Sequence, residues 1–233
     1  KYKMIYPPIL LFSGSLIFMI AILNLFGHKY ALVHPDSRKH HSGVIPQIGG
    51  LFFGPVLLFL AWWSGLAPHW YIIGGAVSIL LGTIDDNLHV PWKIKFTVQV
   101  ALATYLSIIF WGRFDVITFY NLSLSISQIE LLIIFFFWFI GIYNAVNLLD
   151  GLDGLAGGFT LLLCLGLGLS DSGPMATLNL IFAIIILGFL VFNQRPAKLF
   201  MGDSGSLFLG FHMAVVPLLF LESTLSVNIL SMT

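Results

Sequence analysis

The sequence predicts an all-α protein, a polytopic membrane helix bundle of about eight transmembrane helices that forms one domain over residues 1–233. Its residues are 58% hydrophobic and only 9% charged, whereas about 25% of the residues in a soluble domain are charged. The mean hydropathy is +0.99. The apolar runs lack the alternation of barrel strands, and a helix in lipid satisfies its own backbone hydrogen bonds.

Eight apolar runs are separated by Pro, Gly, His or charged residues. A run of about 20 residues crosses the hydrocarbon core of a bilayer. Several of the eight are shorter, so some polar motifs are expected to lie below the membrane surface. The predicted helices cover approximately residues 9–26, 49–66, 70–84, 96–111, 129–146, 155–169, 175–192 and 205–221.

Counting these crossings places four loops, around 27–48, 85–95, 147–154 and 193–204, on one face of the membrane. That face carries seven Lys and Arg residues and the opposite face carries three, so it is predicted to be cytoplasmic. Ionisable groups at a membrane boundary are costly unless they pair, bind a cation or contact water. Six acids share this face, which indicates a site: Asp36, Asp85, Asp86, Asp150, Asp153 and Asp203.

The net charge and the cysteine content exclude other classes of function. A formal net charge of zero excludes a basic nucleic-acid-binding surface as the main function, so no nucleic-acid partner is expected. The single cysteine, Cys164, lies in an apolar run and can form neither an internal disulfide nor a Cys-based metal site.

Asp85 and Asp86 follow the apolar run 70–84 at a membrane boundary. Adjacent carboxylates repel each other, and each tends to bind a proton, a metal ion or a cationic side chain. The alternative is a solvated helix end, although acids near a helix C-terminus oppose the helix dipole. The residues alone leave both interpretations open.

A second polar segment places Asn144, Asn147, Asp150 and Asp153 at a helix end rich in glycine. Oxygen donors at this density suit a hard cation, or the ribose and base edges of a polar ligand. The step Gly154-x-x-x-Gly158 also suits helix packing, and aspartates also suit helix capping. Packing alone does not explain four polar side chains.

A third segment, Phe-Met-Gly-Asp-Ser-Gly-Ser over residues 200–206, places Asp203 among small residues that expose backbone amides. This arrangement suits a phosphate or phosphate–metal cradle, and a helix N-cap is the alternative role for Asp203. The segment lacks the pattern GxxxxGK[ST], so a P-loop nucleotidase is disfavoured.

Basic residues gather on the same face, in Arg-Lys-His-His over residues 38–41 and at Lys93 and Lys95. They either set topology and contact lipid headgroups or bind anionic phosphates. Together the segments predict a carboxylate–amide pocket suited to Mg²⁺ beside a basic fringe at the membrane surface. Such a place suits the joining of a water-soluble diphosphate to a lipid phosphate.

These motifs resemble the polyprenyl-phosphate N-acetylhexosamine-1-phosphate transferase family. The resemblance covers nearly the whole chain and rests on Arg38-Lys39 through Pro46 and Gly49-Gly50, Asp85-Asp86, Asn144 through Gly154, and Phe200 through Ser206. The first motif looks closest to the bacterial undecaprenyl-phosphate GlcNAc-1-phosphate transferases, which are related to the phospho-MurNAc-pentapeptide translocase.

The resemblance implies a Mg²⁺-dependent enzyme, with Mn²⁺ as an alternative ion, in the bacterial inner (plasma) membrane. Such an enzyme transfers N-acetylhexosamine-1-phosphate, here GlcNAc-1-phosphate, from a UDP-N-acetylhexosamine to undecaprenyl phosphate and releases UMP. The transfer initiates the synthesis of a cell-envelope polysaccharide such as lipopolysaccharide.

Carried onto this sequence, the resemblance makes Asp85, Asp86 and Asp203 catalytic and makes Asp203 and Asn147 metal ligands. The aspartate pair would lie near the attacking lipid phosphate. A phosphate monoester has a second pKa of about 6 and is largely ionised at neutral pH, so the pair is predicted to place cations and phosphate rather than remove a proton. The implied substrate-binding residues are Lys39, His41, Lys93, Lys95, Asn144, Asp150, Asp153 and Phe200, the last against the uracil.

Members of the family continue for two or three further helices and a His-rich cytoplasmic loop, which the resemblance places beyond Thr233. A truncated inactive relative that binds nucleotide or lipid is therefore one alternative function. A membrane transporter is the less favoured alternative, because a carrier would hold its acids at the midplane. The step Gly50-x-x-x-Gly54 allows close helix contacts within the chain or in a homodimer.

Overall fold

The computed structural model describes residues 8–26, 32–33, 45–113, 116–119, 122–125, 127–170 and 172–231. The helices in this part of the chain are α1 (Pro8–Phe26), α2 (Gly49–Trp63), α3 (His69–Leu88), α4 (Trp92–Ile109), α5 (Gln128–Leu149), α6 (Leu155–Ser170), α7 (Pro174–Asn193) and α8 (Gly202–Ser231). Two antiparallel hairpins join β1 (Leu32–Val33) to β2 (Ile45–Pro46) and β3 (Val116–Phe119) to β4 (Leu122–Ser125).

Each predicted run lies within or largely overlaps one of these helices, and α8 continues to Ser231 instead of ending near residue 221. The all-α prediction is confirmed: the described residues form eight helices, and the two short hairpins lie in the connections between them. The hydrophobic pattern did not indicate these strands, because an alternating pattern is recognisable only over about four to eight residues and the strands have two to four.

Three described helical segments are long and apolar enough to cross a membrane: Gln128–Leu149, Pro174–Asn193 and Gly202–Glu222. Three further apolar segments are shorter: Leu10–Ala21, Gly49–Trp63 and Leu155–Ser170. These lengths and compositions confirm a helical membrane protein.

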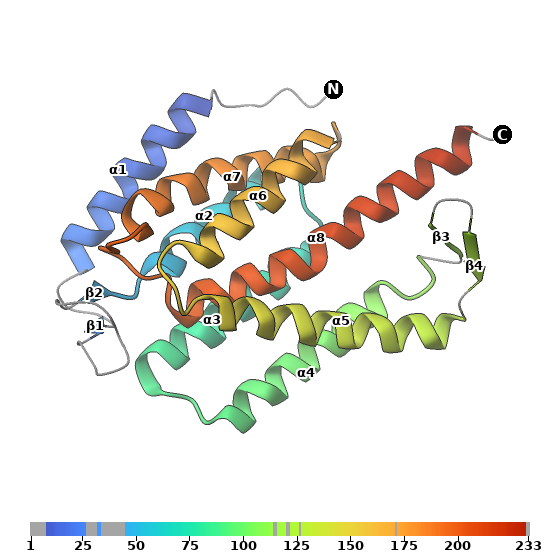
Figure 1. Cartoon of the computed structure of the whole chain (residues 1–233), viewed down its shortest axis with the longest axis horizontal. Helices are drawn as coiled ribbons and strands as arrows, with labels where there is room; N and C mark the ends of the chain where they lie inside the picture. The colour runs from blue at the N-terminus through green and yellow to red at the C-terminus, as the bar shows by residue number, and fades with distance from the viewer. Residues whose placement is uncertain are drawn as a thin grey trace.

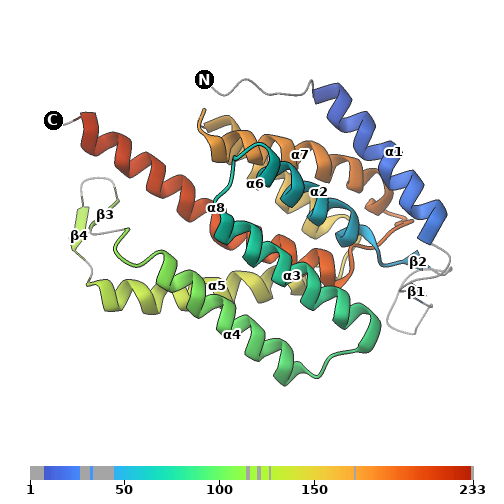
Figure 2. The same cartoon turned by 180° about the vertical axis from the view of Figure 1, so that it is seen from behind.

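Helix α8 lies in the middle of the molecule (Figure 1). Helices α3, α4 and α5 lie on one side of it and α1, α2, α6 and α7 on the other, an arrangement that the reverse view also shows (Figure 2). The most extensive packing of α8 is against α3 and α5. The side chains of α8 up to Leu219 are accordingly almost all buried.

Two features hold the N-terminal end of α8 in place. The backbone N–H groups of Gly49 and Gly50, which open α2, donate to the carbonyls of Phe200 and Met201 at 3.0 and 2.9 Å. A Cβ at Gly50 would lie 2.1 Å from the backbone nitrogen of Gly205, so α2 and α8 meet backbone to backbone. Gly50 thus packs within the chain, and the homodimer stays a prediction.

A polar cluster lies at the centre of the bundle around the fully buried His212 of α8. The Tyr71 hydroxyl lies 2.7 Å from His212 Nδ1, and His212 Nε2 lies 3.2 Å from Asn179 Oδ1. Each polar atom here has a partner, as a lipid-embedded bundle requires. The contacts join α3, α7 and α8.

Candidate active site

Four helix ends meet at one end of the bundle. They are the C-terminal ends of α3 and α5 and the N-terminal ends of α4 and α8 (Figure 1). Because α3 and α4 are joined by a turn of only three residues, the polar segment that ends α3 lies beside the lysines that begin α4. Sequence segments far apart in the chain therefore share one end of the fold.

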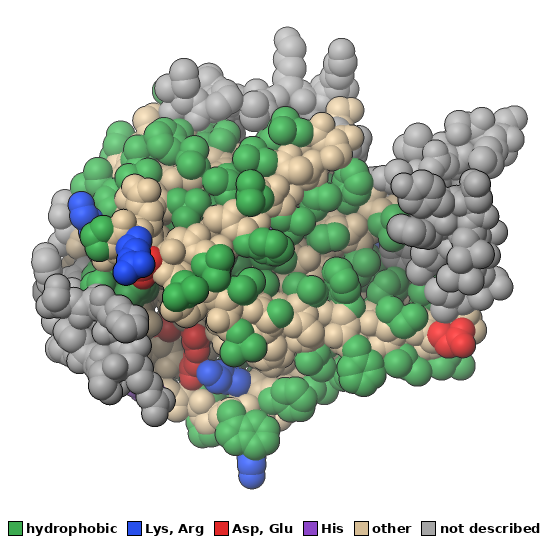
Figure 3. Space-filling model, viewed as in Figure 1, with side chains coloured by type: hydrophobic (Ala, Val, Ile, Leu, Met, Phe, Trp, Pro, Cys, Tyr) green, Lys and Arg blue, Asp and Glu red, His purple; other side chains and the backbone are tan. Residues whose placement is uncertain are grey.

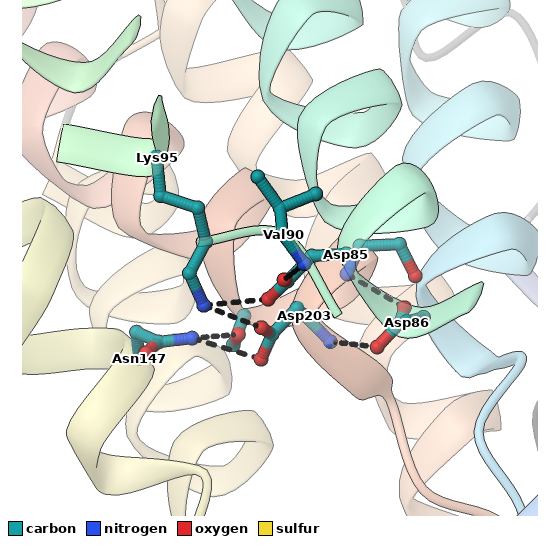
Figure 4. Close-up of polar contacts among 8 residues, drawn as sticks. Asp85, Asp86, Val90, Lys95, Asn147 and Asp203 are labelled. Atoms are coloured by element: carbon teal, nitrogen blue, oxygen red, sulfur yellow. Dashed lines mark hydrogen bonds and ion pairs between the residues drawn. The ribbon is translucent and has the colours of Figure 1, made fainter. Parts of the chain in front are cut away.

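A lysine ammonium lies between two carboxylates at this place (Figure 4). Lys95 Nζ is 2.5 Å from Asp85 Oδ2 and 3.3 Å from Asp203 Oδ2. The other oxygen of Asp85 accepts the backbone N–H of Val90 at 2.7 Å. The structure thus brings three of the predicted site residues into direct contact.

Asn147 joins the same group from α5. Its Nδ2 donates to Asp203 Oδ1 at 3.2 Å and to the Ser206 hydroxyl at 2.7 Å. Ser206 was not among the predicted site residues, although it follows Asp203 by three residues and such residues share one helix face. That spacing was the available signal for a residue that orients the amide of Asn147.

Asp86 contacts a different kind of group from its neighbour Asp85. Its Oδ1 accepts the backbone N–H of Asp203 at 2.7 Å, and its Oδ2 accepts that of Ser204 at 3.0 Å (Figure 4). Asp203 lies within the first turn of α8, which begins at Gly202, so it is not the N-cap residue. The carboxylate of Asp86, supplied by α3, binds these first-turn N–H groups instead.

Carboxylates outnumber cations in the described part of this site, and burial is the largest influence on their pKa values. Burial raises the pKa of Asp85, but its hydrogen bonds with Asp203 and Lys95 outweigh that effect, so the pKa lies below its ordinary value. Burial raises the pKa of Asp86. Burial also raises the pKa of Asp150 well above its ordinary value, and the charges of Asp203 and Asp86 raise it further. This excess of negative charge favours a bound cation.

The remaining described candidates make few contacts with this group. Lys93 is exposed, and its ammonium lies 5.9 Å from the centre of the Trp92 ring. The amide of Asn144 donates to the carbonyl of Ile140 at 2.8 Å, within its own helix. Neither contact involves the carboxylates.

The loop before α8 positions two further candidates. Asp153 Oδ2 accepts the backbone N–H of Ala197 at 3.2 Å, and the side chain of Asp153 is exposed. The backbone N–H of Phe200 donates to the carbonyl of Pro46 at 2.9 Å, which ties this segment to β2. Two other candidates, Lys39 and His41, lie outside the described residues.

The donors fit the hard divalent cation that the resemblance implies. No group of three or more His, Cys, Asp or Glu side chains within the described residues is arranged to hold a metal ion. Mg²⁺ does not need such a cage, because it is commonly held by one or two carboxylates, waters and substrate phosphates. Asp203 and the side-chain amide of Asn147 would supply the protein ligands of that set. The ammonium of Lys95 lies between the carboxylates of Asp85 and Asp203, so a cation already fits there.

The surface is divided between apolar and charged regions. Hydrophobic side chains are spread over the face that Figure 3 shows, whereas basic and acidic side chains gather toward one end of it and an acidic group lies toward the other. An acidic and a basic group adjoin in a hollow toward the end where α3 meets α4. The site therefore lies where an apolar surface gives way to a polar one.

Known proteins match this chain over most of its length. The model of glycosyl transferase family 4 matches residues 69–221. A Bacillus subtilis protein named as a probable undecaprenyl-phosphate N-acetylglucosaminyl 1-phosphate transferase is 36% identical over 81% of this chain and 55% of its own. A Thermotoga maritima undecaprenyl-phosphate alpha-N-acetylglucosaminyl 1-phosphate transferase is 32% identical over 89% of this chain and 64% of its own.

A relative with a different name also matches. A Synechococcus phospho-N-acetylmuramoyl-pentapeptide-transferase is 36% identical over 79% of this chain and 58% of its own. The chain thus spans between 55% and 64% of the length of these three relatives. The matched residues 69–221 contain the predicted site residues that meet at the end of the bundle, namely Asp85, Asp86, Lys95, Asn147 and Asp203. This protein belongs to glycosyl transferase family 4.

Proposed function

We propose that this chain transfers N-acetylhexosamine-1-phosphate, and specifically GlcNAc-1-phosphate, from a UDP-sugar to undecaprenyl phosphate. An oxygen of the lipid phosphate forms a bond to the sugar-bearing phosphorus. The bond from that phosphorus to the bridging oxygen breaks, and UMP leaves with that oxygen. The product is a lipid-linked diphosphate sugar, which initiates the synthesis of a cell-envelope polysaccharide.

The observation that carries this proposal is the convergence of Asp85, Lys95 and Asp203 from three helices on one point at the end of the bundle. Phosphoryl transfer depends on positioning and on stabilising negative charge. A site that combines carboxylates for a cation with an ammonium for a phosphate supplies both. The names of the relatives from Bacillus subtilis and Thermotoga maritima support the same acceptor and sugar.

Each residue of the site has its own role in the proposed transfer. Asp203 and Asn147 would hold Mg²⁺, which when bound supplies positive charge against the pyrophosphate. Lys95 exchanges one of its carboxylate contacts for a phosphate oxygen when the donor binds. Asp85 keeps that ammonium oriented. Since the lipid phosphate is largely ionised at neutral pH, with a second pKa of about 6, no side chain has to remove its proton.

The nucleotide lies on the side of the site formed by residues 150–153 and 200 in this proposal. Asp150 and Asp153 follow α5 in the chain, and Asp150 is close enough to Asp203 for the charge of Asp203 to raise its pKa. Phe200 lies just before α8, three residues before Asp203. Asn144 and Lys93 contribute contacts to the substrate at the edges of the site. Lys39 and His41 are proposed to bind the phosphates as well.

The proposed orientation places this site at the cytoplasmic surface of a bacterial plasma membrane that eight helices cross. Support comes from α8, whose charged residues pair at both ends: Asp203 with Lys95, and Glu222 with Arg113 at 3.1 Å. Glu222 follows Asp203 by 19 positions, or about 28 Å of helix, close to the thickness of a hydrocarbon core of about 30 Å. The excess of Lys and Arg on the loops at the Asp203 end favours the cytoplasm for that end.

A transporter is disfavoured by the same geometry. The described carboxylates of the site lie at helix ends, and the polar cluster deeper in the bundle around His212 contains no carboxylate. A carrier is expected to hold its acids near the midplane of the membrane. The arrangement therefore favours chemistry at one surface.

The test is to incubate the purified 233-residue chain in detergent with undecaprenyl phosphate, Mg²⁺ and a panel of radiolabelled UDP-sugars. We expect label from UDP-GlcNAc to enter the organic phase with equimolar release of UMP. Asp203→Ala serves as the blank. Binding of UDP-GlcNAc by the folded chain without organic-phase label would overturn the transfer and favour the non-catalytic alternative.

A further inference from the structure

The two adjacent acids at the end of α3 face different groups. Asp85 faces an ammonium and the side chain of Asp203, whereas both oxygens of Asp86 are occupied by backbone N–H groups of α8. The donors are those of Asp203 and Ser204, at 2.7 and 3.0 Å. Nothing in the sequence distinguishes the two acids, so both were predicted to lie near the lipid phosphate.

The position of Asp86 matches a need of α8. The first N–H groups of a helix have no acceptor within the helix, and a carboxylate near them is also favoured by the helix dipole. The α8 helix begins at Gly202, so Asp203 and Ser204 belong to this first turn. Asp86 thus acts as a cap that one helix supplies to another.

The fit around this cap is close. Gly202 has a φ of +71°, and a Cβ there would lie 2.7 Å from Asp86 Oδ2. Glycine adopts this backbone conformation without steric cost and leaves room for the carboxylate. The segment that leads into α8 is therefore shaped around Asp86.

From these contacts we propose that Asp86 is a positioning residue. It fixes the first turn of α8 and thereby aims the Asp203 carboxylate at Lys95 and Asn147, while the contact with reacting phosphates belongs to Lys95, which Asp85 orients. The part of this inference that concerns catalysis rests on the proposed function; the part that concerns the backbone of α8 does not.

Amide hydrogen exchange of the full chain in detergent, without substrates, tests the positioning role directly. The variant Asp86→Asn keeps the shape of the side chain but replaces one acceptor oxygen by an NH₂ group that faces an N–H donor. We expect amides in the segment 201–206 to exchange at least tenfold faster in this variant. The matched control Asp85→Asn removes the neighbouring carboxylate and should leave exchange in that segment unchanged.

Segment 178–189 of the buried helix α7 is the internal reference for global unfolding. Unchanged exchange over 201–206 in Asp86→Asn, or an equal increase in Asp85→Asn, would overturn the inference. Faster exchange over α7 to the same extent as over 201–206 would also overturn it, because the effect would then not be local to the start of α8.

Transfer kinetics separate positioning from contact with the lipid phosphate. Asp86→Asn should lower kcat about 10- to 100-fold, and leave the KM for undecaprenyl phosphate within about twofold, because a misaimed Asp203 affects the transition state more than acceptor binding. A rise in that KM with kcat unchanged would show that Asp86 contacts the acceptor. Absence of transfer in the unsubstituted chain would refute the proposed function. It would not refute the positioning role of Asp86, because hydrogen exchange is measured without activity.

Discussion

Gly82 on α3 and Asp203 on α8 meet backbone to backbone: a Cβ at position 82 would lie 2.3 Å from the carbonyl carbon and oxygen of Asp203. Gly82 precedes Asp86 by one helical turn. The same face of α3 therefore brings the backbone of α8 close and supplies the carboxylate that caps it. The place of the Asp203 side chain is set by this contact between two helices.

Gly82→Ala is expected to push α3 and α8 apart at the site. Overpacking of a well-packed contact costs about 1–3 kcal/mol, so the variant should have a lower thermal unfolding midpoint in detergent and a lower transfer rate. Gly141→Ala is the matched control, because a Cβ there has no atom within 4 Å. Equal midpoints for Gly82→Ala and the unsubstituted chain would contradict this packing.

Lys95→Met is expected to reduce transfer about 10- to 100-fold, because a hydrogen bond to a charged group contributes about 1.5–3 kcal/mol. The loss should be greater than in Lys95→Arg, which keeps the charge. Lys198→Met removes an exposed cation from the same face and is the control for net charge. Initial rates with radiolabelled donor measure the difference. The role given to Lys95 would be wrong if the two Met variants lost activity equally.

Asp203→Asn is expected to weaken activation by Mg²⁺. Even outer-shell partners of metal ligands change affinity about 10- to 100-fold, so loss of a ligand should raise the half-saturating Mg²⁺ concentration by at least about 10-fold. Glu222→Gln removes a carboxylate from the opposite end of the same helix and should leave that concentration unchanged. A titration of Mg²⁺ at fixed substrate concentrations provides the measurement, and an unshifted Asp203→Asn curve would argue against this metal site.

Asp150→Asn is expected to stabilise the protein at pH 8 and to have little effect near pH 4. Burial raises the pKa of Asp150 in the folded state, so its ionisation above the ordinary pKa of about 3.9 opposes folding. That penalty grows as the pH rises toward the folded-state pKa and is then constant. Each kcal/mol removed should raise the unfolding midpoint by about 2–4 °C. Unfolding midpoints of this variant and of the unsubstituted chain, measured in detergent across this pH range, provide the check. A stabilisation that is largest at acidic pH would contradict the raised pKa of Asp150.

The order and location of the helices follow from the sequence because a bilayer imposes a simple rule. A lipid-embedded segment has to be apolar over most of its length and has to satisfy its own hydrogen bonds, so the run 129–146 predicts α5 and the run 175–192 predicts α7 within a few residues. The parity of crossings then brings Asp85, Asn147 and Asp203 to one face. This rule does not predict hairpins such as β3–β4, because their strands are too short to show an alternating hydrophobic pattern.

Only the tertiary structure decided what each polar side chain contacts. Asp85 and Asp86 are identical and adjacent in sequence, but successive helix residues point about 100° apart, so one meets Lys95 and the other the backbone of α8. The role of Ser206 likewise depends on α5 bringing Asn147 within 2.7 Å of its hydroxyl. Helix periodicity and hydropathy determine which residues reach the membrane surface, whereas contacts between side chains a few ångströms apart depend on how glycines such as Gly82 let the helices approach.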